Sequence, residues 1–267
     1  MNVIDTYDQV ASEFSKTRNH TWADFGVFKK VVQRQMLSTN CSLSVLDIGC
    51  GNGRLISSLS PLFYKEGVGG GIHYAGIDAS AGMIEQAKKL HPDCDFHVAD
   101  MRELPFDDNS FDIVFAIASF NHMLTKEVQE KALSEMFRVL KPGGYVCMTN
   151  WNLWRLTLKE KSWWHYVFCR DVMLARLIRW DKDDNCLQRD APGGRLYNHP
   201  IKIVTTHWNN HPLPYYAFTL RELKRMVKHA GFKIETAMYS KNGIKAHWWN
   251  GRNIILVARK NLTNTIK

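Results

Sequence analysis

The fold of this chain is decided by one short stretch, Val45-Leu46-Asp47-Ile48-Gly49-Cys50-Gly51-Asn52-Gly53. Its apolar residues around a single acid predict a buried parallel strand, and the three alternating glycines predict a tight turn into a helix. Because glycine has no Cβ atom, a ligand can lie directly against the backbone of such a turn, next to the electropositive amino terminus of the helix. The alternative is a strand-to-helix turn that binds no ligand.

Four more segments follow in an order that favours a nucleoside site. Asp78 ends the next apolar segment, where an acid can bind both hydroxyls of a ribose. A third apolar segment ends at Asp100, a fourth covers 111–118, and the turn Leu140-Lys141-Pro142-Gly143-Gly144 leads into a fifth. A dinucleotide-binding fingerprint would need glycine at position 54, where this chain has Arg54.

The glycine run, the acids that follow the second and third strands and the Leu-Lys-Pro-Gly-Gly turn together resemble the core of class I S-adenosylmethionine-dependent methyltransferases. The resemblance implies an α/β, Rossmann-like fold with a seven-stranded, mostly parallel sheet and helices on both faces. It also implies an enzyme whose cofactor is S-adenosyl-L-methionine. Methyl transfer from a sulfonium is an in-line displacement, so the protein mainly aligns the reactants and excludes water, and no catalytic triad is expected.

The resemblance assigns roles to the loop and to the acids. The backbone at Gly49, Gly51 and Gly53 would approach the methionyl and ribose parts of the cofactor. Asp47 would order the loop and meet the amino group directly or through water, and Asp78 would take the ribose hydroxyls. The other expected cofactor-binding residues are Cys50, Asn52, Ala79, Met83, Asp100, Met101, Ala116 and Ile117.

The adenine end of this site depends on three residues. Asp100 would accept from the adenine amine, and Met83 and Met101 would sandwich the ring. Alternatives remain open: core packing for the two methionines, a solvated turn for Asp100 and a helix cap for Asp78. Cys50 fits the loop as a small residue and is not expected to be a catalytic thiol.

Asn121 and His122 follow the fourth strand, where substrate and methyl group would meet, and are the candidate catalytic residues. His122 is interpreted either as a base or hydrogen-bond partner of the substrate, or as a structural hydrogen-bonding residue. An acidic nucleophile needs no general base, whereas an amine or hydroxyl can need one.

Composition narrows the function classes. The 267 residues are 45% hydrophobic, enough for a full core, and lack an apolar run long enough for a membrane span. The amino terminus has no signal-peptide core. Six cysteines without a Cys-x-x-Cys pair argue against a zinc site or a disulfide framework. This cysteine usage favours a reducing compartment, and we expect a cytoplasmic protein.

Charge is divided unevenly along the chain. Residues 1–150 contain 14 Lys and Arg against 18 Asp and Glu, a balance of −4, whereas residues 151–267 contain 21 against 8, a balance of +13. Eight of the nine tryptophans also lie after position 150. Positive charge with aromatic planes is typical of a nucleic-acid surface. The alternative is a lid whose tryptophans form its core and whose lysines face solvent.

Periodicity predicts one domain over 1–267. Strands are expected at 44–49, 73–78, 95–99, 111–117 and 144–150, and helices at 53–61, 80–90 and 125–139. Thr219 is expected to cap a helix that runs to about His229, before antiparallel strands at 233–240 and 252–259. The expected parts are N-terminal helices (1–43), a cofactor-binding core (44–150), an inserted aromatic and basic lid (151–214), and a C-terminal helix and hairpin (215–260).

Both ends of the chain carry a narrower resemblance. The quoted residues are Tyr7-Asp8-x-Val10-Ala11-x-x-Phe14-x-x-Thr17-Arg18-x-x-x-Trp22, then Pro214-Tyr215-Tyr216-x-Phe218-x-x-x-Glu222-Leu223, and the strand Asn253–Lys260. They resemble the tRNA wobble-uridine carboxymethyl methyltransferases, which include the methyltransferase domain attached to an AlkB-type oxygenase. That family tends to have His-His where this chain has Asn121-His122, which leaves the substrate open.

The narrower resemblance implies that the target is a carboxylate on a modified tRNA wobble base, esterified by methyl transfer. Partners would be tRNA and, as in many members, a small zinc-binding activator subunit. Tyr7 and Arg18 would close over the cofactor, unless Arg18 forms only a surface salt bridge. Expected substrate-binding residues are Trp22, Arg195, His199, Tyr216, Arg221 and Lys224. Two alternatives remain: a methyltransferase of a small metabolite, such as a quinone precursor or another small acid or amine, and a non-catalytic scaffold.

Overall fold

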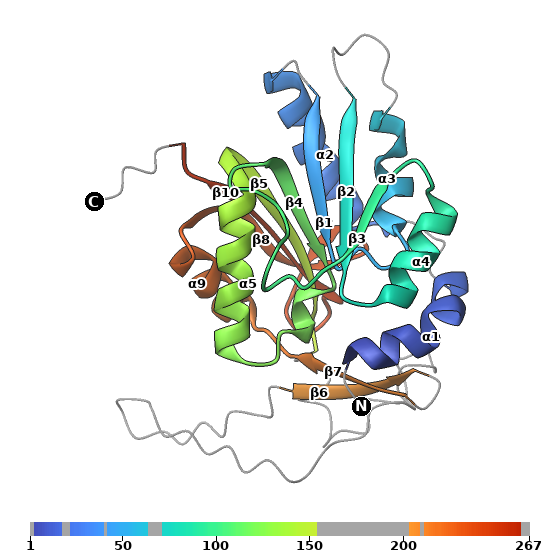
Figure 1. The fold of residues 1–267 in the computed structure, drawn as a ribbon. Coiled ribbons are helices and arrows are strands. Elements are labelled where there is room, and N and C mark those ends of the chain that lie inside the picture. Colours follow the sequence, from blue (N-terminus) through green and yellow to red (C-terminus); the bar gives the residue numbers. More distant parts are fainter. Residues whose placement is uncertain are drawn as a thin grey trace, which may run out of the picture.

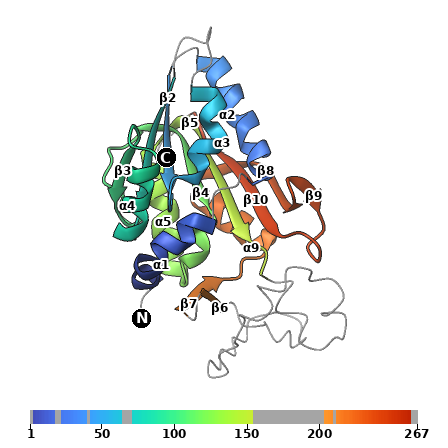
Figure 2. The same ribbon diagram turned by 90° about the vertical axis from the view of Figure 1, so that its right-hand side faces the viewer.

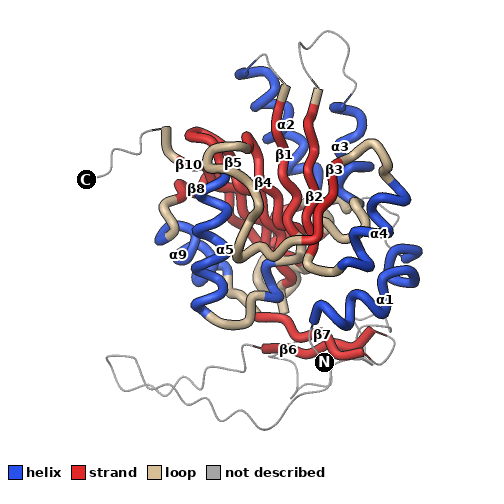
Figure 3. The backbone as a smooth tube through the Cα atoms, viewed as in Figure 1, coloured by secondary structure: helices blue, strands red, loops and turns tan. Residues whose placement is uncertain are grey.

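The computed structural model describes residues 3–17, 22–39, 42–63, 71–153, 203–208 and 211–262. Helices cover both faces of a central sheet, as Figures 1 and 3 show. The N-terminal helix and a small second sheet lie across one end of that central sheet (Figures 1 and 2).

The central sheet has the strand order β3-β2-β1-β4-β5-β10-β8-β9. Its parallel strands are β1 (Leu43–Ile48), β2 (Ile72–Asp78), β3 (Asp95–Val98), β4 (Phe111–Ile117) and β5 (Leu140–Trp151). The strand β10 (Asn253–Lys260) runs antiparallel between β5 and β8 (Phe232–Lys241). This order confirms the expected sheet and its antiparallel C-terminal pair.

One short strand, β9 (Ile244–Ala246), extends the sheet beyond the seven strands expected. It pairs with β8 through the two-residue turn Asn242-Gly243, whose φ angles are 55° and 79°. Positive φ at both residues is the geometry that tight hairpins select, and Asn-Gly adopts it readily. The dipeptide therefore explains the extra strand.

The helices begin and end close to where periodicity and capping place them. They are α1 (Val3–Thr17), α2 (Phe25–Thr39), α3 (Arg54–Phe63), α4 (Ala81–Leu90), α5 (Lys126–Val139) and α9 (Leu220–His229), with a 3-10 turn η1 (Phe120–His122). The predicted cap of α9 is confirmed, since Thr219 Oγ1 accepts from the Glu222 N–H at 3.1 Å. Ser80 caps α4 in the same way through the Met83 N–H at 3.1 Å.

The core lies on both faces of the sheet because successive residues of a strand point to opposite sides. Val114 and Ala116 of β4 pack with α5 and α9, whereas Ile113 and Phe115 pack with α2 and α3. A strand buried on both faces reads as a continuous apolar run, which is why 111–117 could be recognised. Phe115 meets Phe28 of α2 edge-on, with ring centroids 5.9 Å apart.

The second sheet pairs β6 (Ile203–Trp208) with β7 (His211–Tyr216) in antiparallel register. The expected lid boundary at 214 therefore falls inside β7, and the rest of the expected lid, 154–202, lies outside the described residues. The strand β7 packs beside α1, where Thr6 Oγ1 donates to the Pro212 carbonyl at 3.3 Å. Among the described helices, none has the length and apolar character needed to cross a bilayer.

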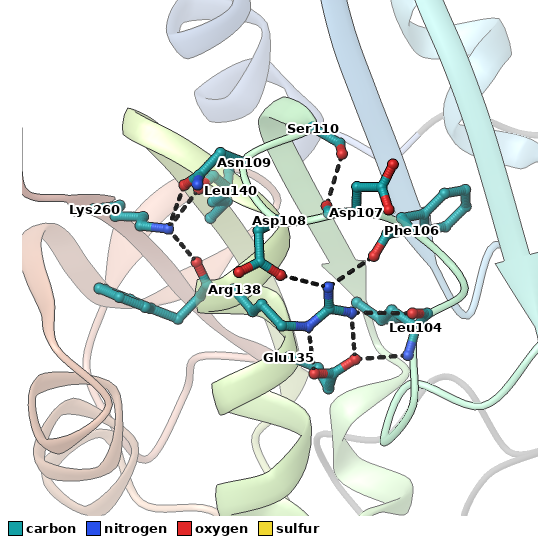
Figure 4. A network of polar contacts seen from close by, with 11 residues as sticks. Leu104, Phe106, Asp107, Asp108, Asn109, Ser110, Glu135, Arg138, Leu140 and Lys260 are labelled. Atoms are coloured by element: carbon teal, nitrogen blue, oxygen red, sulfur yellow. Dashed lines mark hydrogen bonds and ion pairs between the residues drawn. The ribbon is translucent and has the colours of Figure 1, made fainter.

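A polar network around Arg138 fixes the loop that leads into β4 (Figure 4). Arg138 donates to Glu135 and Asp108, and to the carbonyls of Leu104 and Phe106, over distances of 2.7–3.0 Å. These carboxylates raise the pKa of the Arg138 guanidinium further. The network lies before β4 begins, away from the strand ends that form the site described next.

Candidate functional site

A cavity of about 480 Å³ opens where the parallel strands β1, β2 and β4 end. The strand order reverses between β1 and β4, and ligands of open α/β sheets bind at such switch points. The volume lies in the range of small-molecule sites. The helix α1 and the strand β7 close the cavity from outside the sheet, where Figure 1 shows them.

The glycine turn forms one wall by allowing a close approach of two strand ends. Gly49 has φ +70°, and a Cβ atom there would lie 2.3 Å from the Ser119 Cβ. Ser119 Oγ donates to the Ile48 carbonyl at 2.7 Å, so the ends of β1 and β4 are held together. Gly51, with φ +58°, exposes its backbone to the cavity.

Two buried acids stand beside this turn. Asp78 accepts from the Gly51 N–H and the Ser80 N–H, each at 2.9 Å. A carboxylate has about four acceptor positions, so Asp78 keeps acceptor capacity for a ribose hydroxyl. Asp47 Oδ2 accepts from the Tyr74 hydroxyl at 2.8 Å, whereas its Oδ1 is buried with no hydrogen-bond partner among the described residues.

Burial governs the charge of both acids. It raises the pKa of Asp47 to about 7, opposed by the Tyr74 hydrogen bond and reinforced by Asp78. It also raises the pKa of Asp78, against the lowering effect of the Ser80 and Gly51 N–H groups. An unpartnered, buried carboxylate oxygen at a cavity wall is costly unless a ligand supplies a donor. Asp47 Oδ1 is therefore suited to an ammonium group.

The helix α1 is fastened over the cavity at two points along its length. Asp8 Oδ1 accepts from Ser80 Oγ at 2.6 Å and from the Gly82 N–H at 2.9 Å. Asn52 Nδ2 donates to Ser15 Oγ at 3.0 Å, which ties the glycine turn to the last part of the helix. These bonds place Tyr7 and Phe14, both from α1, in the cavity wall.

Tyr7, His122 and Tyr215 form a hydrogen-bonded group in the cavity wall. His122 Nδ1 lies 3.0 Å from the Pro214 carbonyl, which can only accept, so Nδ1 carries the proton. Burial lowers the pKa of His122 to about 4, so the ring is neutral and Nε2 accepts from the Tyr7 hydroxyl at 3.0 Å. The Tyr215 hydroxyl lies 3.4 Å from the Tyr7 oxygen.

An aromatic and cationic wall completes the cavity. The Arg54 guanidinium lies over the Trp22 ring, 4.0 Å from its centroid. Trp22 also meets Trp151 edge-on at 5.4 Å and stacks on Phe25 at 5.9 Å. Trp22, expected to bind substrate, therefore lines the cavity, whereas Arg54 and Trp151 were not among the expected site residues.

Most of the expected cofactor residues line this cavity. They are Tyr7, Asp47, Gly49, Cys50, Gly51, Asn52, Asp78, Ala79, Met83, Asp100, Met101 and Ile117. Asp100 is also engaged by the Arg102 side chain, whose hydrogen bonds lower the pKa of that carboxyl. Burial raises the pKa of the Cys50 thiol well above its usual range, so the thiol stays protonated.

Two of the expected cofactor residues that the structure describes do not line the cavity. Gly53 faces α4 and β3, since a Cβ atom there would lie 2.7 Å from the His91 ring and 3.2 Å from Phe96. Ala116 is fully buried in the core on the α5 side of the sheet. Successive residues of β4 point to opposite sides of the sheet, so Ile117 lines the cavity and Ala116 does not.

The structure also corrects two positions at the substrate end. Asn121 is buried outside the cavity wall, because its Nδ2 donates to the Tyr216 carbonyl and its Oδ1 accepts from the Trp151 N–H, both at 2.8 Å. Asn121 therefore joins β7 to β5 and does not face the ligand space. Tyr216 points into the core and bonds Glu222 at 2.7 Å, while its neighbour Tyr215 lines the cavity.

Two of the remaining expected substrate residues lie away from the cavity, and the others are not among the described residues. Arg221 and Lys224 lie on α9, outside the cavity wall. Arg195 and His199 of the expected substrate residues, and Arg18, which was expected at the cofactor, lie outside the described residues. Within the described ranges, no group of three or more His, Cys, Asp or Glu side chains is placed to hold a metal ion.

The cavity fits an adenosyl amino acid. The unpartnered Asp47 Oδ1 suits its ammonium, the glycine backbone allows close approach, and Asp78 offers free acceptor positions to a ribose. Met83 and Met101 supply polarisable apolar surface next to Asp78. The donors and acceptors thus agree with S-adenosylmethionine.

Comparison with known proteins agrees with this geometry. A family model described as a methyltransferase domain matches residues 45–144. The chain is 30% identical over 152 residues to the tRNA (carboxymethyluridine(34)-5-O)-methyltransferase of Saccharomyces cerevisiae, a match that covers 57% of this chain and 48% of that protein. It is 30% identical over 181 residues to the ubiquinone/menaquinone biosynthesis C-methyltransferase UbiE of Campylobacter jejuni, covering 66% of this chain and 72% of that protein. This chain thus spans about half the length of the yeast protein.

A solved structure shares the fold over nearly the whole chain. It is a Haloferax volcanii protein, described as a putative methyltransferase, in complex with the Trm112 methyltransferase activator. The two chains superpose with a TM-score of 0.59 at 16% identity, over 97% of this chain and 98% of that one. At this identity the likeness establishes the architecture.

Proposed function

This chain belongs to the S-adenosylmethionine-dependent methyltransferases, and we propose that its acceptor is the carboxylate of a modified wobble uridine in tRNA. The product would be a methyl ester. The observation that carries this proposal is the 30% identity to the yeast enzyme, whose name states a carboxymethyluridine acceptor. The +13 balance of residues 151–267 supports a polyanionic partner.

At the cofactor end, the bound S-adenosylmethionine supplies a methyl group on a sulfonium that already carries the driving force for transfer. Asp47 would hold the amino group through Oδ1, and Asp78 would hold the ribose. The backbone at Gly49 and Gly51 would fix the chain between them. These residues bind and orient, which is the main requirement of an in-line displacement.

At the acceptor end, the described side chains are Tyr7, His122 and Tyr215. His122 is neutral near pH 7, and its Nε2 is occupied by the Tyr7 hydroxyl. With a pKa of about 4 it is a weak base, which suits an acceptor that is already ionised. A carboxylate acceptor needs alignment and exclusion of water, and the aromatic wall around Trp22 provides an apolar surface for both.

We also propose that the chain acts with a small activator subunit. The Haloferax volcanii neighbour, solved with the Trm112 activator, supports this proposal. Co-expression with such an activator should raise the soluble yield and the methylation rate of this chain. Equal rates with and without the activator would contradict it.

A second function has its own support. The UbiE relative is matched over 72% of its length, which favours a small quinone-type acceptor methylated at carbon. Such an acceptor binds without phosphate contacts, so raising the salt concentration should leave its binding nearly unchanged. RNA binding should instead weaken steeply with salt.

The deciding experiment uses methyl-labelled S-adenosylmethionine and total tRNA from cells that lack this modification. Nucleosides are separated and identified by mass spectrometry after incubation with the wild-type protein, with Asp78→Ala and with the exposed-site control Glu85→Gln. We expect label in one modified uridine, removed by mild alkali as an ester should be, and strongly reduced with Asp78→Ala. Label confined to small molecules would reject the tRNA assignment and favour the metabolite function.

A further inference from the structure

The turn between β9 and β10 displays aromatic rings to solvent. Trp248 and Trp249 are 46% and 54% exposed. His247 stacks on Trp249 with ring centroids 4.3 Å apart and planes inclined by 6°, and Trp248 meets Trp249 at right angles. Large aromatic side chains are normally buried, so adjacent exposed tryptophans indicate a binding surface.

The backbone of the turn is held by hydrogen bonds from its own residues and from Asn152. The Gly251 N–H donates to the His247 carbonyl at 2.8 Å, and Asn250 Oδ1 accepts from the His247 N–H at 2.9 Å. Asn152 Nδ2 donates to the carbonyls of Trp248 and Gly251 at 2.7 and 2.9 Å. A turn fixed in this way presents its rings with little entropy left to lose on binding.

The turn lies next to the cavity described above. Asn152, which holds it, follows Trp151, and Trp151 lines the cavity and contacts Trp22. In the sheet, Asn253 at the start of β10 pairs with Trp151 at the end of β5. Figure 2 shows the β9–β10 connection at the same end of the sheet as α1 and β7.

The charge around the turn is positive. Lys241, Lys245 and Arg252 are exposed on the hairpin and its turn. From 236 to 267 the sequence contains six Lys or Arg and no Asp or Glu. Phosphates are therefore attracted to the same surface that presents the aromatic planes.

From these observations we propose that the β9–β10 turn (247–252) is a stacking platform for unpaired RNA bases beside the methyl-transfer cavity. This proposal rests on the proposed tRNA function and names the part of the chain that receives the acceptor strand. Bases of any identity stack on exposed tryptophan, whereas a fully paired duplex offers no free faces. The exposed lysines of the hairpin bind the flanking phosphates.

The test compares two RNA probes at fixed salt: a hairpin with the sequence of a tRNA anticodon arm, and the fully paired duplex of its stem. Replacing both tryptophans with alanine (W248A and W249A together) should weaken hairpin binding about tenfold or more, as loss of base stacking does. The corresponding double phenylalanine variant should bind within about twofold of wild type, because an aromatic face remains. Ile244→Ala, which changes a 72% exposed side chain on the β8–β9 hairpin of the protein, is the matched control and should leave RNA binding unchanged.

Duplex binding and cofactor affinity should be the same in all four proteins, which reports that the fold is intact. If the double alanine variant binds the RNA hairpin as tightly as wild type, the platform proposal is overturned. The same result is expected if a protein partner, and not RNA, covers the turn. The two proposals fail separately. Tryptophan-dependent hairpin binding without tRNA methylation would refute only the acceptor, and tRNA methylation with unchanged hairpin affinity would refute only the platform.

Discussion

Asp47→Asn should raise the free energy of unfolding of the protein and lower its affinity for the cofactor. The wild-type carboxylate is buried, with one oxygen bonded to Tyr74 and the other unpartnered among the described residues. An asparagine keeps the bond to Tyr74 through its carbonyl oxygen and places its amide nitrogen where Oδ1 was. No described donor group bonds Oδ1 in the wild-type protein, so the new amide nitrogen is not placed against another hydrogen-bond donor.

The size of the stability effect follows from the pKa. Raising the pKa of Asp47 from 3.8 to about 7 means that its ionised form costs about 4 kcal/mol in the folded protein at pH 8. Asparagine removes this cost but buries an amide, which takes back about 2 kcal/mol. The net gain of about 2 kcal/mol should raise Tm by about 4–8 °C. The sign is fixed because the folded state binds the proton more tightly, so wild-type stability falls as pH rises from 4 to 7.

The binding effect has the opposite sign. A lost charge-assisted hydrogen bond to an ammonium costs about 2–3 kcal/mol, so the affinity for S-adenosylmethionine should fall by about 30- to 150-fold. Wild-type affinity should itself be about tenfold weaker at pH 6 than at pH 8, since protonated Asp47 is neutral. The Asn variant should lose this dependence.

Titration calorimetry with S-adenosylmethionine at pH 6, 7 and 8, and thermal unfolding at pH 8, measure both effects on the same preparations. Glu85→Gln, an exposed acid paired with Lys89, is the control and should change neither. Unchanged affinity in the Asn variant would show that the ammonium does not lie at Asp47. A lower Tm would show that the carboxylate is stabilised by partners, which would refute the reasoning from desolvation.

Three further substitutions test other parts of the structure. Gly49→Ala should lower the unfolding free energy measured in urea by about 2–5 kcal/mol, because a Cβ at this positive-φ position would lie 2.3 Å from Ser119. The control Gly26→Ala, in open space on α2, should not destabilise the protein. Equal effects of the two substitutions would contradict the close approach at Gly49. His122→Gln should be less stable than wild type, and the difference in unfolding free energy should shrink by about 2 kcal/mol from pH 7 to pH 5. The reason is that the unfolded wild-type histidine takes up a proton below pH 6.5, whereas the folded one, with a pKa of about 4, does not. A difference that stays constant with pH would show that His122 is not neutral. Arg138→Ala should lower the unfolding free energy by about 1–3 kcal/mol and leave the affinity for the cofactor unchanged. Weaker cofactor binding would show that the Arg138 network is not separate from the site.

The sequence predicted the elements whose cause is local. The strand 111–117 is apolar at every position but Asp112, the cap at Thr219 is a single side chain, and the glycine turn needs positive φ. Each of these signals is complete within a few residues. The Asn242-Gly243 signal was equally local, and reading it would have predicted β9.

The parts that sequence did not predict depend on which way a side chain points. Tyr215 and Tyr216 are adjacent and of one type, and only the pairing of β7 decides that Tyr215 faces the cavity. Asn121 was a plausible site residue from its place in the sequence, but its amide bonds Trp151 of β5 and Tyr216 of β7, and Tyr216 is 95 positions away. Asp8 fastens α1 to Ser80 across a separation of 72 residues, which no local pattern encodes.

The uneven charge along the chain acquires a physical meaning once the cavity is placed. The ammonium and sulfonium of the cofactor are cationic, and the buried acids Asp47 and Asp78 that suit them come from the acidic half of the sequence. The proposed acceptor is anionic both at its phosphates and at its reacting carboxylate, and the exposed Lys245 and Arg252 come from the basic half. Opposite charges on the two ligands are matched by two fields of opposite sign, a negative one from the buried acids at the cofactor end of the cavity and a positive one from exposed basic residues outside it. A chain that methylated a neutral quinone would gain nothing from the second of these fields, so the salt dependence of acceptor binding discriminates between the two proposed functions.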